Sequence, residues 1–151
     1  MRDGGERKYE ILLIEDNPAD AVIIEERLKD CDGPGKSCNV RWLENCAKVM
    51  PFLKSPEMAA YRPDLIVLDY RMPTNGGRAL TELKSDPDYQ EIPIVVLTGS
   101  VSRADVHDIY RRGANCCYHK PPDLDGLDSL LKMLTEHWLT KICSPTSSSR
   151  S

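Results

Sequence analysis

Five short apolar runs, each followed by a segment with helical spacing, constrain the fold of this chain more than any other feature of its sequence. The runs are nearly continuous in Ile, Val and Leu and do not alternate with polar residues, which is typical of parallel strands buried on both faces of a sheet. The sequence therefore predicts five strands, at Tyr9–Glu15, Asn39–Leu43, Asp64–Asp69, Ile92–Thr98 and Asn115–Lys120.

Helices are expected to follow the strands, at residues 17–30, 44–54, 77–85, 103–112 and 124–142. Asn17 is a suitable N-cap for the first of them, with Pro18 at the first helical position and Asp20 favourably placed at the positive end of the helix dipole. Pro51 removes a backbone donor and predicts a kinked or shortened second helix. Gly113 is expected to end the fourth helix.

Strands that alternate with helices over short connections predict an α/β domain with a doubly wound parallel sheet. The chain of 151 residues has room for one such domain, which we place at residues 9–142. The charged segment 1–8 and the Ser-rich segment 143–151 have little apolar surface to bury, so both are expected to be flexible tails.

Composition argues against several classes of partner. The chain has 24 acidic and 20 basic residues and a net charge of −4, without a basic cluster, so we expect no binding to nucleic acid. No apolar run approaches the roughly 20 residues of a spanning helix, so no membrane is expected either. The charged start is unlike a signal peptide, which predicts a cytoplasmic protein whose six cysteines are reduced. Zinc binding is the alternative for the cysteines, but no C-x-x-C pair occurs.

Polar and charged residues stand at the ends of four predicted strands. They are Glu15 and Asp16, then Asp69, Thr98 and Lys120. Each has an ordinary explanation when taken alone, as a helix cap, a turn residue or a surface side chain. The carboxyl ends of parallel strands meet at one edge of a sheet, however, and this is where α/β domains bind their ligands.

Three carboxylates at one edge would repel one another and raise one another's pKa unless a cation lay among them. Mg²⁺ suits this set because it binds carboxylates and completes its shell with water and phosphate oxygens. Lys120 and the Thr98 hydroxyl offer a positive charge and a donor for a phosphoryl group. Asp69, which we expect to emerge from the core at this edge, is then the natural nucleophile for an aspartyl phosphate.

The segments "IEDN", "LDYRMPTNGG", "VLTGS" and "KPP" together resemble the receiver domain of two-component response regulators, over about residues 9–142. The "EDNPAD" and "GANC" segments resemble the single-domain regulators that accompany bacterial phytochrome kinases. The resemblance implies a flavodoxin-like (βα)5 sheet with strand order 2-1-3-4-5. With no further domain expected after residue 142, we predict a stand-alone response regulator.

The resemblance also implies a role for each motif residue. Asp69 would accept a phosphoryl group from a sensor histidine kinase, with Mg²⁺ held by Glu15, Asp16, Asp69 and the Arg71 backbone carbonyl. Thr98 and Lys120 would contact the acyl phosphate. The residues expected to modulate the site or transmit its state are Arg71, Ser100, Cys117, Tyr118 and Pro121. Such a domain changes conformation to signal to a partner protein and is not an enzyme with an external substrate.

One position departs from the family pattern. Most receivers have an aromatic residue three positions before the lysine, and it moves inward when the threonine engages the phosphoryl group. Here that position is Cys117, and the tyrosine comes one place later, at Tyr118. Because side chains alternate along a strand, Tyr118 should project to the opposite face. We therefore expect Thr98 to move on phosphorylation without a large aromatic swing.

Apolar residues at the C-terminal end of the chain favour a homodimer. We expect Met133, Leu139 and Ile142 to lie outside the core stripe of the helix at 124–142 and to form, with the helix at 103–112 and the strand at 115–120, the dimer surface. The kinase, for which the resemblance implies a bacteriophytochrome, should dock near the first helix, where Glu26 and Arg27 are expected to be exposed.

Two alternative functions have to be weighed against a phospho-accepting response regulator. A Mg²⁺-dependent phosphatase on a similar sheet usually needs an acidic residue two positions after its nucleophile, where this chain has Arg71. A degenerate receiver that acts only as a binding module would not need the full set of Asp16, Asp69, Thr98 and Lys120, and the chain has all four.

Overall fold

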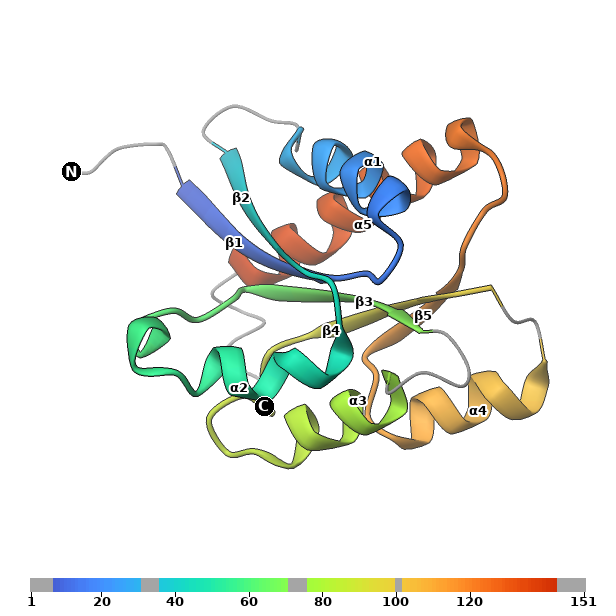
Figure 1. Cartoon of the computed structure of the whole chain (residues 1–151). Helices are drawn as coiled ribbons and strands as arrows, with labels where there is room; N and C mark the ends of the chain where they lie inside the picture. Colours follow the sequence, from blue (N-terminus) through green and yellow to red (C-terminus); the bar gives the residue numbers. More distant parts are fainter. Residues whose placement is uncertain (1–6, 31–35, 71–75, 100–101, 144–151) are drawn as a thin grey trace.

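The sheet has five parallel strands in the order β2-β1-β3-β4-β5 (Figure 1). The computed structural model describes residues 7–30, 36–70, 76–99 and 102–143. The strands are β1 (Arg7–Ile14), β2 (Lys36–Leu43), β3 (Leu65–Tyr70), β4 (Ile94–Thr98) and β5 (Cys116–His119). The predicted doubly wound, flavodoxin-like sheet with order 2-1-3-4-5 is confirmed.

Helices cover both faces of this sheet (Figure 1). They are α1 (Pro18–Lys29), α2 (Val49–Leu53), α3 (Gly76–Ser85), α4 (Arg103–Arg111) and α5 (Leu124–Cys143), with short 3-10 turns at Cys46–Lys48 and Pro56–Met58. Figure 1 shows α1 and α5 on one face and α2, α3 and α4 on the other. The inner strands β3 and β4 are thus buried along their whole length, which explains their continuous apolar sequence.

Two hydrophobic clusters, one on each face, hold the layers together. On β1, Ile11 and Leu13 pack in the cluster under α1 and α5, whereas Leu12 and Ile14 pack in the cluster under α2 and α3. All four side chains are buried, as the two-residue periodicity of a strand requires. The central strands β1 and β3 therefore fix the layers against each other, and their carboxyl ends open at the same edge.

The first two strands are longer than predicted because backbone pairing continues past the apolar runs. β1 begins at Arg7 and β2 at Lys36, and these two residues are register partners. Residues 1–6 and 144–151, which make up most of the two expected tails, lie outside the described residues. As Pro51 predicted, the second helix is short.

The ends of α1 and α4 follow the sequence closely. The Asn17 side chain accepts hydrogen bonds from the backbone N–H groups of Ala19 and Asp20, at 3.0 and 3.3 Å. After α4, Gly113 adopts a positive φ of 114°, and the next N–H reaches back to the Ile109 carbonyl at 3.3 Å. This is the C-terminal arrangement that a glycine permits at no steric cost.

One prediction about α5 is wrong. Leu139, expected on the surface, is 1% exposed and belongs to the core cluster beside Trp138. The buried stripe of α5 is wider than expected, because Thr135, four residues earlier, is buried as well. Met133 is 43% exposed, as predicted, and the side chain of Ile142 lies outside the described residues.

Within the described part of the chain, no helix combines the length and the hydropathy needed to cross a membrane. The four cysteines whose side chains are described are free thiols, namely Cys38, Cys46, Cys116 and Cys117.

Candidate functional site

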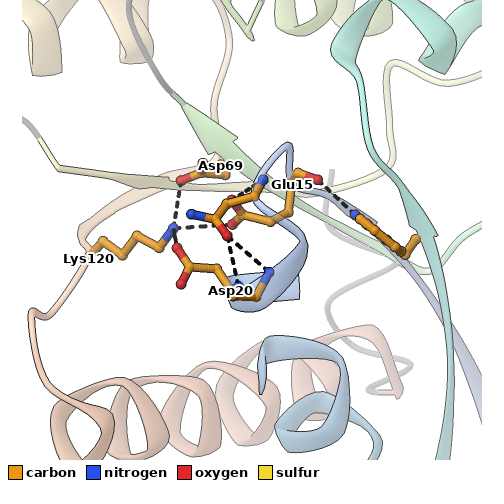
Figure 2. Close-up of polar contacts among 7 residues, drawn as sticks. Glu15, Asp20, Asp69 and Lys120 are labelled. Carbon is orange, nitrogen blue, oxygen red and sulfur yellow. Dashed lines mark hydrogen bonds and ion pairs between the residues drawn. The ribbon is translucent and has the colours of Figure 1, made fainter. Parts of the chain in front are cut away.

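The carboxyl edge of the sheet brings together groups from three strands and one helix. Glu15 and Asp16 follow β1, Asp69 lies near the end of β3, and Lys120 directly follows β5. Asp20 joins them from the first turn of α1. Figure 2 shows the Lys120 side chain reaching across this edge, with its ammonium group among the carboxylates of Glu15, Asp20 and Asp69.

The Lys120 ammonium is the positive centre of the site. Its Nζ atom lies 3.1 Å from Glu15 Oε1, 3.1 Å from Asp20 Oδ2 and 3.2 Å from Asp69 Oδ1. The lysine backbone is fixed too, because its N–H donates to the Thr98 carbonyl at 2.8 Å. The Lys120 ammonium therefore partly neutralises three carboxylates that are each at least 51 residues away from it in the sequence.

Three of the carboxylates could hold a metal ion. Ligand oxygens of Glu15, Asp16 and Asp69 all lie within 4.8 Å of one another, and Glu15 and Asp69 are buried while Asp16 is exposed. Hard oxygen donors in such a group suit Mg²⁺ or a similar divalent cation. The exposed Asp16 leaves one side of the group open to solvent, from which an ion can enter.

The backbone and side chain of Glu15 are both held in place. Its N–H donates to the Leu43 carbonyl at 3.1 Å, and its own carbonyl accepts the Trp42 indole N–H at 2.7 Å. Its second carboxylate oxygen accepts the Asn17 N–H at 3.2 Å. The orientation of this acidic group is therefore set by β2 and by the cap of α1 before any ligand binds.

Electrostatics favours a cation at this edge. Burial and the nearby charge of Asp69 raise the pKa of Glu15 to about 7, although Lys120 opposes the shift. Burial lowers the pKa of Lys120, but the charges of Asp69 and Glu15 outweigh it and the net shift is upward. A divalent ion would stabilise the charged form of Glu15, so the residues present fit the predicted metal.

Asp69 is less accessible than its place at the sheet edge suggested. The residue is only 6% exposed, and β3 continues one residue beyond it to Tyr70. The expectation that Asp69 emerges from the core is therefore wrong in this respect.

Tyr70 connects the end of β3 with α3 and α4. It is the register partner of Thr98, which is 3% exposed, so the two side chains share one face of the sheet. The Tyr70 hydroxyl donates to Asp108 at 3.4 Å, and Arg112 binds the same carboxylate at 2.8 Å. Arg112 also donates to the Gly77 carbonyl at 3.1 Å. Sequence reasoning did not predict this link between the acceptor strand and two helices.

Cys117 and Tyr118 lie on opposite faces, as strand alternation predicted. Cys117 packs against the cluster under α2, α3 and α4, whereas Tyr118 packs against the cluster under α1 and α5. The aromatic neighbour of Cys117 on its own side is Tyr110 of α4, whose hydroxyl accepts the Cys117 N–H at 3.0 Å. The position that carries an aromatic side chain in most receivers thus has a thiol here.

The remaining predicted residues are only partly accounted for. Arg71 and Ser100 lie outside the described residues, and Pro121, which follows Lys120, is partly exposed. Asp20 was missed as a site residue, because its place in the first turn of α1 already gave it a function toward the helix dipole. Its position four residues after Asp16 was the feature of the sequence that could have indicated its place in the site.

A parallel sheet of this order, with a buried aspartate, an acidic cluster and a lysine at its carboxyl edge, defines a class of phosphoryl-accepting signalling domains. The family model for the response regulator receiver domain matches residues 11–135. The chain belongs to the response regulator receiver domain family. It is thus a response regulator of two-component signalling, as the sequence predicted.

Among proteins of known function, the chain is similar to the response regulator Rcp1 of Synechocystis, with 33% identity over 96% of this chain and 99% of that protein. Among solved structures, it resembles the phosphorylated cyanobacterial phytochrome response regulator RcpA, with 36% identity and a TM-score of 0.78 over 89% of this chain and 96% of the other. The Mn²⁺-bound form of Rcp1 has 34% identity and a TM-score of 0.76, over 87% and 94% of the two chains. Receiver domains bind a divalent cation at such an acidic pocket, and the described residues include the acidic cluster, so the predicted divalent-cation cofactor is confirmed.

We predict that Mg²⁺ affinity depends on pH through Glu15. Because the pKa of Glu15 is about 7, its carboxylate is mostly protonated at pH 6 and mostly charged at pH 8. A metal that needs the charged form should then bind about tenfold more weakly at pH 6 than at pH 8. Calorimetric titration with MgCl₂ at both values measures this ratio.

The matched variant for this test is Glu15→Gln. It should bind Mg²⁺ weakly at both pH values and lose most of the dependence between them. A wild-type affinity that stays constant from pH 6 to pH 8 would contradict the assignment of the titration to Glu15.

Proposed function

We propose that this chain is a stand-alone response regulator that accepts a phosphoryl group on Asp69 from a sensor histidine kinase, with Mg²⁺ as cofactor, and then signals to a partner protein by changing conformation. The observation that carries the proposal is the placement of the Lys120 ammonium 3.2 Å from the Asp69 carboxylate, beside three carboxylates that can share a cation. The likeness to the response regulator Rcp1 over nearly its whole length supports the assignment as a response regulator.

In the proposed transfer, an Asp69 carboxylate oxygen attacks the phosphorus of a phosphohistidine. The new P–O bond forms while the P–N bond breaks, and the departing imidazole keeps the electron pair. Glu15, Asp16, Asp69 and the Arg71 carbonyl would hold the cation, which supplies positive charge to the phosphoryl oxygens when bound. Lys120 contributes the second positive charge, and the Thr98 hydroxyl a hydrogen bond.

This activity has no external product besides released phosphate. The phosphoryl group stays on the chain until water removes it, so the protein is a phospho-acceptor and not an enzyme that turns over a substrate. The burial of Asp69 supports this reading, since only 6% of the residue is exposed.

We further propose that the kinase is a phytochrome-type sensor and that it docks beside α1. The support is the likeness to Rcp1 and to the phytochrome response regulator RcpA. On α1, Glu26 is exposed, and Val22, one turn earlier, is 54% exposed. Arg27 is exposed there as well, as predicted, and forms an ion pair with Asp128 of α5 at 2.9 Å. A cytoplasmic location remains a prediction from the sequence.

The first test of the proposal is chemical phosphorylation. Incubation with Mg²⁺ and acetyl phosphate should add the mass of one phosphoryl group to the intact protein, and the adduct should disappear on brief treatment at alkaline pH, because acyl phosphates hydrolyse readily. Asp69→Asn should show no adduct. The measurement is intact-protein mass spectrometry with and without Mg²⁺.

The control variant is Asp64→Asn, which alters a carboxylate outside the site, bound to the backbone N–H of Glu10. It should be phosphorylated like the wild type. An adduct that persists in Asp69→Asn would contradict the assignment of the acceptor, and steady phosphate release from external phosphoesters would favour a phosphatase.

We also expect an unusual conformational response. Tyr118 packs under α5, so an inward swing toward Thr98 would require it to cross to the other face of the sheet. Phosphorylation should therefore move Thr98 and, through its neighbour Tyr70, the Asp108 and Arg112 contacts between α3 and α4. Structures with and without beryllofluoride, which mimics the phosphoryl group, provide the comparison. A full rotation of Tyr118 toward Thr98 would refute this prediction.

A homodimer through α4, β5 and α5 is the last part of the proposal. Its support is smaller than the sequence suggested, because Leu139 is buried, but Tyr110 of α4 and Met133 of α5 are 46% and 43% exposed. Light scattering should give twice the monomer mass, and Met133→Lys should weaken association by placing a charge in the interface. A monomeric mass both before and after phosphorylation would exclude the dimer.

A further inference from the structure

Asp20 is the one described partner of the Lys120 ammonium that lies outside the acidic cluster of Glu15, Asp16 and Asp69. Its Oδ2 atom is 3.1 Å from Nζ, as close as Glu15 and closer than Asp69. The Asp20 side chain is 37% exposed, whereas those of Glu15 and Asp69 are 0% and 4% exposed. Asp20 is thus the most exposed of the three carboxylates that contact the ammonium, all of which are drawn in Figure 2.

The place of Asp20 in the fold is fixed independently of Lys120. It lies in the first turn of α1, and its N–H donates to the Asn17 side chain at 3.3 Å. The cap that starts the helix therefore sets where the carboxylate stands. Lys120, in contrast, reaches the site at the end of a long and flexible side chain. The position of its ammonium group therefore depends on the carboxylates around it.

The two buried carboxylates on Lys120 are also the ones that a cation would take. When a divalent ion binds Glu15 and Asp69, their attraction for the ammonium decreases, because their charge is shared with the ion. The contact with Asp20 is not in competition with the ion in this way. Among the described contacts, it is the one that can hold the Lys120 ammonium at this edge of the sheet throughout the exchange.

We propose that Asp20 is a positioning residue for Lys120, and this inference rests on the proposed function. In the resting site Asp20 draws part of the ammonium charge away from Glu15 and Asp69, which leaves these carboxylates more available to Mg²⁺. Once a phosphoryl group is present, Asp20 competes with it for the same ammonium. Asp20 therefore promotes cation binding and weakens the hold of Lys120 on the phosphoryl group.

Opposite changes in two affinities follow for Asp20→Asn. Mg²⁺ should bind about three- to tenfold more weakly, because Lys120 then pairs fully with Glu15 and Asp69. Beryllofluoride at saturating Mg²⁺ should bind more tightly by a similar factor, because the competing carboxylate is gone. Asp20→Glu, which keeps the charge, should restore both affinities toward the wild type. Calorimetry measures Mg²⁺ binding, and Trp fluorescence measures the beryllofluoride complex.

Loss of any negative charge near the site would also weaken Mg²⁺ binding and strengthen beryllofluoride binding. The deciding measurement is therefore a double-mutant cycle. In a Lys120→Gln background, Asp20→Asn should change the Mg²⁺ dissociation constant less than twofold if it acts through the lysine. An equal change in both backgrounds would overturn the proposal, because Asp20 would then act on the ion directly. Glu25→Gln, which removes a negative charge from the same helix where Glu25 pairs with Lys29, should leave both affinities unchanged.

Different results would refute the proposed function and the role of Asp20. If the wild-type chain bound neither Mg²⁺ nor beryllofluoride, the proposed function itself would be refuted. If it bound both and Asp20→Asn, with an unchanged melting temperature, shifted neither affinity, only the role of Asp20 would be refuted.

Discussion

The balance between one ammonium group and four carboxylates at the carboxyl edge of the sheet determines what this structure can do. Lys120 reaches Glu15, Asp20 and Asp69 within 3.2 Å, and Asp16 stands beside them in the acidic cluster. The site is therefore short of positive charge, and burial together with the nearby charge of Asp69 raises the pKa of Glu15. A divalent cation reduces it, and a phosphoryl group then becomes acceptable beside an aspartate.

The strand order makes this balance possible. β1 and β3 are neighbours, so Glu15, Asp16 and Asp69 meet although more than fifty residues separate the first two from the third. β5 lies two strands from β3, and a lysine is long enough to cover that distance at the sheet edge. The apolar clusters on both faces fix the strands, so the carboxylates cannot move apart to relieve their repulsion.

Much of this was predictable from the sequence, for reasons that are local. Apolar runs followed by capped helices gave the strand order once the family resemblance was recognised, and residues at strand ends gave Asp16, Asp69 and Lys120. Asp20 was not predicted as part of the site, because its contact with Lys120 spans 100 residues and the helix dipole already explained its position. The burial of Leu139 and Asp69 was missed because it depends on how wide a face the neighbouring elements cover, which periodicity does not specify.

The contact between Tyr110 and the edge strand has a consequence for assembly. β5 is the last strand of the sheet, and its Cys117 N–H is bound by the tyrosine hydroxyl of α4. Exposed backbone donors on an edge strand are templates for pairing with another chain. The Tyr110 hydroxyl thus occupies a backbone donor of the edge strand, and any displacement of α4 from β5 would break this hydrogen bond. A displacement of α4 would therefore also expose a backbone donor on the edge strand of the sheet.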